Sequence, residues 1–219
     1  MKSESTDSAA PARGGGRTRN RRGEGALLRD EIVAAAERLL EREGDEEALS
    51  LRSVAREAGI SAPSIYTHFA DREAILDAVL DIAFERLRRV VTESSAGIAD
   101  PVERLHAGCR AYARFGIEEP ARYRVLFGRR RADPPVPGAG LSAVWQRRHE
   151  AFMTLVEGLD GCVKAGRSGS TNPYADATTL WTSLHGAVTM RQFVPGFPGF
   201  PPLERAVADL VDRIGLIRP

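Results

Sequence analysis

Residues 50–69 read SLRSVAREAGISAPSIYTHF, and this stretch decides the fold. Ser50 is placed to cap a short helix, and Gly59 is placed to end it in a left-handed conformation. Ser61 is placed to cap a second short helix, which we expect to end near Phe69. Two short helices joined by a tight turn form a helix-turn-helix, whose second helix fits the roughly 12 Å wide major groove of DNA.

The second helix of this unit has an apolar side and a small polar side. Ile65 and Phe69 are spaced to pack inward, against Val54 of the preceding helix. The remaining side chains suit DNA, because hydroxyls reach phosphates and methyl groups contact thymine methyls. A generic helical hairpin with a solvated face would show the same pattern, so that interpretation stays open. The outward candidates are Ser61, Ala62, Pro63, Ser64, Tyr66, Thr67 and His68.

Helical periodicity continues on both sides of the unit. A first amphipathic helix runs from Leu27 to Gly44, and Asp71 begins a longer one that ends near Ser95. No stretch has the alternating, β-branched pattern of a strand, so the sequence predicts an all-α protein of about nine helices. The further helices are expected at 100–117, 120–127, 141–164, 174–193 and 203–217, with a proline-rich loop at 131–140.

Three regions follow from this pattern. Residues 1–25 form a predicted disordered basic arm, because they hold few apolar side chains to bury. Residues 26–72 form the predicted helix-turn-helix DNA-binding domain, and residues 73–219 form a predicted larger helical domain, to which the resemblance described below assigns effector binding and dimerisation. Two interpretations of the arm stay open. Either its arginines contact the DNA minor groove, or the arm is a solubilising tail. Its candidate DNA contacts are Arg17, Arg19, Arg21 and Arg22.

Bulk charge alone argues against a nucleic-acid partner. The chain has 219 residues, with 31 basic and 30 acidic side chains and a formal net charge of +1. This balance averages the basic arm with an acidic segment at 27–49. No apolar stretch approaches the roughly 18 residues of a membrane span, no export signal is recognisable, and only two cysteines occur. We therefore expect a cytoplasmic protein without a membrane partner.

The match to a known family rests on residues 29–80. The Ala-Gly-Ile-Ser turn, the Ile-Tyr-x-His-Phe run and the acidic-basic-Glu-Ala start of the next helix resemble the TetR family of bacterial transcriptional regulators. The resemblance implies that base edges face Ala62, Pro63, Ser64 and Thr67. It implies that the sugar-phosphate backbone contacts Ser50, Arg52, Tyr66, His68 and Arg72. Residues 61–69 contain no Arg, Gln or Asn, so bidentate base contacts are absent from this helix.

Two helices near the C-terminus have the pattern of a dimer interface. The helix at 174–193 has no charge from Ala177 to Met190, and it includes a stripe of small side chains. The last helix repeats apolar residues at four-three steps, as coiled coils do. Doubled by two-fold symmetry, these helices would form a four-helix interface, although both seams could serve only their own core. The interface candidates are Ser183, Gly186, Met190, Leu203, Val207, Leu210 and Ile214.

Two short segments resemble a TetR-like subgroup whose C-terminal domain is named for a Trp-His-Gly signature. They are LWTSLHGAVTM, with Trp181, His185 and Gly186, and YRVLF at 123–127. This resemblance implies a helical domain that dimerises and binds an effector. Each pocket candidate could instead be an ordinary core residue. The candidates are Tyr112, Phe115, Phe127, Trp145, Phe152, Trp181 and His185.

The prediction is therefore a homodimeric regulator without catalytic residues, metal or cofactor, in which a small-molecule effector releases a repressor from a palindromic operator. One alternative is a dimeric DNA-binding regulator that senses no ligand and acts through a protein partner or by competing for DNA. Another is a helical enzyme that uses His106 and Cys109, which lie three residues apart on one helix.

Overall fold

The computed structural model describes residues 24–44, 46–127 and 143–218. Within these ranges the chain is helical, with one isolated antiparallel bridge and no strand, which confirms the predicted all-α class. No described helix is both long enough and apolar enough to span a bilayer. The helices are α1 (Glu24–Glu43), η1 (Glu46–Ala48), α2 (Leu51–Ala58), α3 (Ala62–Ile65), α4 (Arg72–Ser95), α5 (Pro101–Glu118), α6 (Pro120–Phe127), α7 (Ala143–Lys164), α8 (Pro173–Phe193) and α9 (Leu203–Ile214).

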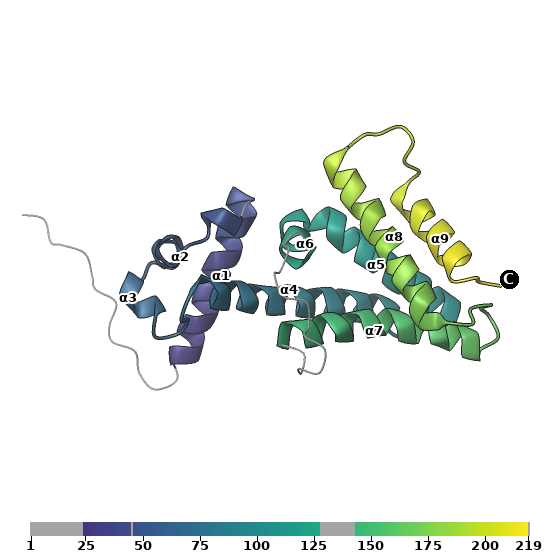
Figure 1. Ribbon diagram of the computed structural model, residues 1–219, viewed down its shortest axis with the longest axis horizontal. Helices are drawn as coiled ribbons and strands as arrows, with labels where there is room; N and C mark the ends of the chain where they lie inside the picture. The colour runs from purple at the N-terminus through teal and green to yellow at the C-terminus, as the bar shows by residue number, and fades with distance from the viewer. Residues whose placement is uncertain (1–23, 45, 128–142, 219) are drawn as a thin grey trace, which may run out of the picture.

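The long helix α4 connects two lobes (Figure 1). Helices α1 to α3 gather around its beginning, α5, α6 and α7 pack along the rest of it, and α8 and α9 pack on α5. α4 packs against α1 in the first lobe and against α5, α6 and α7 in the second. One rigid helix therefore contributes to both lobes.

Side-chain caps fix where several helices begin. The Ser50 hydroxyl accepts a hydrogen bond from the Ser53 backbone N–H at 3.1 Å, and the Ser53 hydroxyl accepts one from the Ser50 N–H at 2.8 Å. Asp71 accepts from the Ala74 N–H at 2.8 Å and so caps α4. Gly59 ends α2 at φ 67°, a conformation that side chains with a Cβ resist. These caps confirm the boundaries expected at Ser50, Gly59 and Asp71, because caps are local features of the sequence. Ser61 precedes α3 as expected but makes no side-chain capping hydrogen bond.

The second helix of the helix-turn-helix is shorter than predicted. α3 ends at Ile65 rather than near Phe69. The N–H groups of His68 and Phe69 both bond to the Ile65 carbonyl, so the next residues form a tightened turn. This turn buries Phe69 to 3% exposure and brings the chain to the extended Asp71. Tertiary packing of one aromatic ring therefore overrides helical propensity.

The last helix is also shorter than predicted. α9 ends at Ile214, not Ile217, because Gly215 is followed by Leu216 at φ 48°. The chain then turns back so that Ile217 forms an antiparallel bridge with Ser168.

A glycine allows three helices of the second lobe to meet closely. A Cβ placed on Gly116 of α5 would collide with the Val188 side chain of α8 and would lie 3.0 Å from the ring of Tyr123 in α6. Val188 and Tyr123 are almost fully buried, so neither could move aside without cost. Gly116 therefore sets how closely α5 approaches α6 and α8.

Candidate functional site

The helix-turn-helix presents its predicted DNA-facing residues outward. Tyr66 is 61% exposed, and Ser61, Pro63 and Thr67 are also exposed. Ile65, one residue before Tyr66, is fully buried. The other candidates lie on the same unit: Ser50 and Arg52 are exposed at the start of α2, and Ala62, Ser64, His68 and Arg72 are half-buried.

Hydrogen bonds order this surface before any partner arrives. The Ser61 and Ser64 hydroxyl oxygens lie 2.7 Å apart, and the Thr67 hydroxyl donates to the Ser64 carbonyl at 2.7 Å. The Nε of Arg72 donates to the Leu49 carbonyl at 2.7 Å. Arg72 thus joins the first turn of α4 to the segment that precedes α2. The four arm arginines of the sequence analysis, numbers 17, 19, 21 and 22, lie outside the described residues.

A cavity of about 790 Å³ opens between α4, α5, α7 and α8 and the end of α6 in the second lobe. Its volume lies within the range of small-molecule sites, roughly 300 to 1,000 Å³. Six of the seven pocket candidates line it: Tyr112, Phe127, Trp145, Phe152, Trp181 and His185. Phe115 does not line this cavity. It is 2% exposed and lies beside a different, smaller cavity, which corrects its assignment.

The sequence analysis missed several residues of this cavity. Arg148 of α7 and the α4 residues Phe84, Leu87, Arg88 and Val91 also line it. Arg148 lies between Trp145 and Phe152 at helical spacing. A charged residue on this otherwise apolar stripe was the sequence signal that identifies it as a candidate cavity residue. The sequence did not mark Phe84, Leu87 and Val91 of α4 as cavity residues, because their spacing is that of ordinary core positions.

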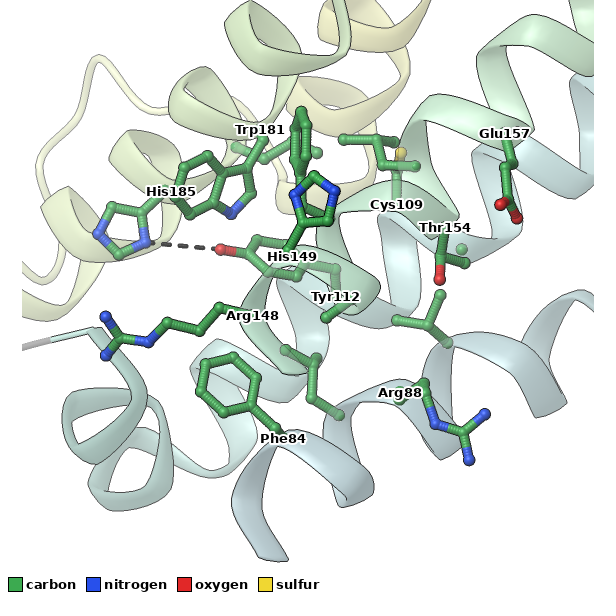
Figure 2. Close-up of a pocket in the computed structure, with 18 of the residues that line it drawn as sticks. Phe84, Arg88, Cys109, Tyr112, Arg148, His149, Thr154, Glu157, Trp181 and His185 are labelled. Atoms are coloured by element: carbon green, nitrogen blue, oxygen red, sulfur yellow. Dashed lines mark hydrogen bonds between the residues drawn. The ribbon is translucent and has the colours of Figure 1, made fainter. Parts of the chain in front are cut away.

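The Tyr112 hydroxyl and Nδ1 of His185 lie 3.5 Å apart beside the cavity (Figure 2), and Tyr123 bonds to both. The Tyr123 hydroxyl lies 2.9 Å from that of Tyr112 and 2.7 Å from Nδ1 of His185. Burial raises the pKa of Tyr112 to about 12 and also raises the pKa of Tyr123. Burial lowers the pKa of His185. All three groups are therefore neutral at physiological pH.

Ion pairs join the two lobes next to the hydrogen-bonded side chains of Tyr112, Tyr123 and His185. Arg122 of α6 lies 2.9 Å from Glu41 and 3.5 Å from Glu37, both on α1. It also lies 2.8 Å from Glu119, which accepts from Arg86 of α4 at 2.7 Å. Burial alone would raise the pKa of Glu119, but the hydrogen bonds from the two arginines hold this pKa below its usual value. The cluster stays ionised and links α1, α4 and α6.

Comparisons with known proteins agree with this architecture. A model described as "Bacterial regulatory proteins, tetR family" matches residues 32–79, which include the helix-turn-helix. A model of a tetracycline repressor-like C-terminal domain matches residues 105–214, half of the chain. The chain belongs to the TetR family. The family models span both the exposed α2–α3 surface and most of the cavity lining.

Individual relatives share this TetR-family organisation. An uncharacterized helix-turn-helix regulator of Mycobacterium tuberculosis is 32% identical over 129 residues, which cover 58% of this chain and 62% of the relative. A Rhodococcus protein of unknown function has a TM-score of 0.73 at 28% identity, covering 86% of this chain and 94% of its own. A TetR family regulator from Marinobacter aquaeolei has the same fold, with a TM-score of 0.66 at 19% identity, covering 88% and 97% of the two chains.

The candidate partner surface of this TetR-family chain is partly uncovered. Met190 of α8 is 47% exposed, and Ser183 and Gly186 on the same stripe are half-buried. A Cβ built on Gly186 would meet no atom within 4 Å. The α9 candidates Leu203, Leu210 and Ile214 pack partly against the core of their own chain. Val207 is 1% exposed within that core, which corrects its assignment to a partner surface.

His106 and Cys109 take different partners despite their spacing. His106 Nε2 lies 2.8 Å from a carboxylate oxygen of Asp212 in α9. Cys109 is buried and lines the cavity, and burial raises its thiol pKa to about 12. A thiol that holds its proton at neutral pH is a poor nucleophile. Among the described ranges, no group of three or more His, Cys, Asp and Glu residues is arranged to hold a metal ion.

Proposed function

We propose that this protein is a sequence-specific DNA-binding transcriptional regulator, a homodimeric repressor that a small-molecule effector releases from a palindromic operator. The observation that carries this proposal is the double role of α4. Its first turn is bonded to the helix-turn-helix through Arg72, and its middle lines the cavity through Phe84, Leu87 and Val91. A ligand that moves α4 would therefore move the DNA-binding surface.

The operator contacts follow from the chemistry of the exposed face. Tyr66, His68, Ser50, Arg52 and Arg72 contact the sugar-phosphate backbone, and Ala62, Pro63, Ser64 and Thr67 face base edges. Because arginine, glutamine and asparagine are absent from residues 61–69, specificity depends on methyl contacts, water and DNA shape.

The dimer forms through α8 and the exposed parts of α9. The small side chains Ser183 and Gly186 and the exposed Met190 support this assignment, because small residues allow helices to approach closely. Trp181, His185 and Gly186 support the further proposal that the second lobe is of the Trp-His-Gly type of TetR-like proteins. Two-fold symmetry then sets two α3 helices about 34–36 Å apart for successive major grooves.

Effector binding shifts the population between two arrangements of the lobes. Two routes connect the cavity to the DNA-binding lobe. One is α4 itself. The other is α6, where Phe127 lines the cavity and Arg122 pairs with Glu37 and Glu41 of α1. In the bound state the two α3 helices lose the spacing that the operator requires.

Genome-wide footprinting of the purified full-length protein tests the proposal. The expected result is protection of a small set of palindromic segments at physiological salt. Absence of any protected segment, with a folded and dimeric preparation, would refute sequence-specific regulation. The genes beside protected segments would also guide the search for the effector.

A further inference from the structure

The hydroxyl groups on the outer side of α3 are already engaged within the protein. This side belongs to the part of the first lobe that faces away from the second lobe (Figure 1). The Ser61 and Ser64 hydroxyl oxygens lie 2.7 Å apart, so one of them donates to the other. The Thr67 hydroxyl donates its single proton to the Ser64 main-chain carbonyl at 2.7 Å. The serine pair therefore keeps one proton for a partner, whereas Thr67 keeps none.

The methyl group is the part of Thr67 that remains for a partner. A threonine carries a hydroxyl and a methyl group on its Cβ, and the hydroxyl can bond to a carbonyl of the preceding turn. This bond holds the Thr67 oxygen against the backbone, yet the side chain as a whole is exposed. A base that approaches Thr67 therefore meets an apolar group and no donor.

Pro63 extends this apolar surface. It is exposed and lies four residues before Thr67. Beyond the end of α3, Tyr66 keeps helical dihedral angles, φ −63° and ψ −17°, so the chain follows a helical path up to Thr67. Residues four apart on such a path lie on the same side. Ile65, midway between the two, is fully buried on the opposite side. The Pro63 ring and the Thr67 methyl group thus form one outward apolar contact area.

Only one of the four standard bases offers an apolar group to this area in the major groove. Thymine presents a methyl group on C5, whereas the edges of adenine, guanine and cytosine present hydrogen-bond donors and acceptors. A donor or acceptor covered by Pro63 and the Thr67 methyl would lose its water without gaining a partner, which is unfavourable. A thymine methyl in the same place would bury apolar surface, which is favourable.

We infer that Thr67 is a specificity-determining residue that recognises a thymine through its C5 methyl group, once in each half of the operator. The inference rests on the proposed function, because it names the base that the DNA-binding surface selects. It adds that a methyl group makes the selection and that the Thr67 hydroxyl acts only within the protein.

A pool of random-sequence DNA duplexes supplies the probe for the test. Duplexes that the full-length protein retains at fixed salt are sequenced. The most enriched duplex is then resynthesised with uracil in place of one thymine at a time, in both half-sites. Uracil keeps the O4 acceptor and the pairing with adenine and lacks only the methyl group. Loss of one buried methyl group costs about fourfold in affinity, so replacement in both half-sites should cost about 15-fold at the position that Thr67 contacts.

Two variants assign this position to Thr67. Thr67→Val keeps a methyl group and loses the hydroxyl, so it should still discriminate between thymine and uracil. Thr67→Ser keeps the hydroxyl and loses the methyl group, so its affinities for the two duplexes should agree within about twofold. Thr92→Ser is the matched control and should discriminate fully, since exposed Thr92 of α4 likewise donates to a main-chain carbonyl, that of Arg88, at 2.8 Å.

The possible failures of this test are distinguishable. Discrimination retained by Thr67→Ser, or lost in a folded Thr67→Val variant, would overturn the inference, because the methyl group would then not be the selecting group. An enriched duplex without any uracil-sensitive position would overturn it as well. These results would leave the proposed function intact, since an enriched sequence itself demonstrates specific binding. Failure of a folded, dimeric preparation to enrich any sequence would overturn the proposed function and the inference with it.

Discussion

Arg122 and Tyr123, consecutive residues of α6, contact opposite sides of the molecule. The Arg122 guanidinium lies 2.9 Å from Glu41 of the DNA-binding lobe, whereas the Tyr123 hydroxyl lies 2.7 Å from His185 beside the cavity. A single turn of helix therefore connects the two candidate sites. A displacement of α6 by a ligand would change both sets of contacts together.

Replacement of Arg122 should weaken the junction between the lobes. Arg122→Met leaves Glu37, Glu41 and Glu119 without their shared cation, so we expect the free energy of unfolding to fall by about 1–2 kcal/mol. Urea denaturation measures this change. Arg114→Met, which breaks an exposed ion pair with Glu204, is the control and should change stability little. Equal effects of the two substitutions would show that the junction is not a special contact.

The pH dependence of stability should include a contribution from His185. Burial lowers its pKa in the folded state, so the unfolded chain binds more protons below the ordinary histidine pKa of about 6.5. Stability therefore decreases as the pH falls through this range. His185→Gln should give a shallower decrease between about pH 7 and pH 5 in thermal denaturation. An identical pH profile for the variant would contradict this assignment.

Loss of the Tyr66 side chain should weaken DNA binding without unfolding the protein. Tyr66 is 61% exposed, so Tyr66→Ala should change stability by less than about 0.5 kcal/mol. Loss of one phosphate contact should reduce operator affinity by about 5- to 10-fold at fixed salt. Tyr174→Ala, a 51% exposed tyrosine in the other lobe, is the control. Unchanged affinity of the Tyr66 variant would remove this residue from the interface.

Deletion of residues 1–22 should make DNA binding less sensitive to salt. Each phosphate contact adds about 0.9 to the slope of log affinity against log salt concentration, and the deleted segment carries five arginines between 13 and 22. Fluorescence anisotropy at several salt concentrations measures this slope. A slope equal to that of the full chain would mean that the arm is a solubilising tail.

An acidic side chain on the exposed stripe of α8 should separate the subunits. Met190→Glu places a charge on the predicted partner surface, where burial without a partner costs several kcal/mol, so the dimer should dissociate at micromolar concentration. Sedimentation velocity measures the mass. Leu27→Glu, at a 60% exposed apolar residue of α1, is the control and should remain dimeric. A dimeric Met190 variant would place the interface elsewhere.

The helices of this protein were largely predictable because their signals are local. Ser50 and Asp71 each cap the helix that the pattern places after them. α3 and α9 are shorter than the pattern predicts, and long-range contacts accompany both differences. Phe69 is buried directly after α3, and Ile217 pairs with Ser168 after α9.

The cavity was predictable in composition but not in detail. Aromatic residues on α5 to α8 indicated a pocket, and six of seven named candidates line it. Phe115 was indistinguishable from them, because helical periodicity gives the direction of a side chain but not which neighbouring helix it meets. Arg148 and Phe84 enter the site only because α7 packs against α4.

The helix-turn-helix, its outward polar face and the all-α class follow from local signals, since caps, glycine turns and apolar periodicity act within a few residues. The packing of distant segments was needed to show that α4 connects both sites, that Arg122 pairs with Glu37 and Glu41, and that Arg148 lines the cavity. These contacts join segments tens of residues apart. A single sequence does not specify such pairs, because any exposed arginine could pair with any of thirty carboxylates until packing selects one.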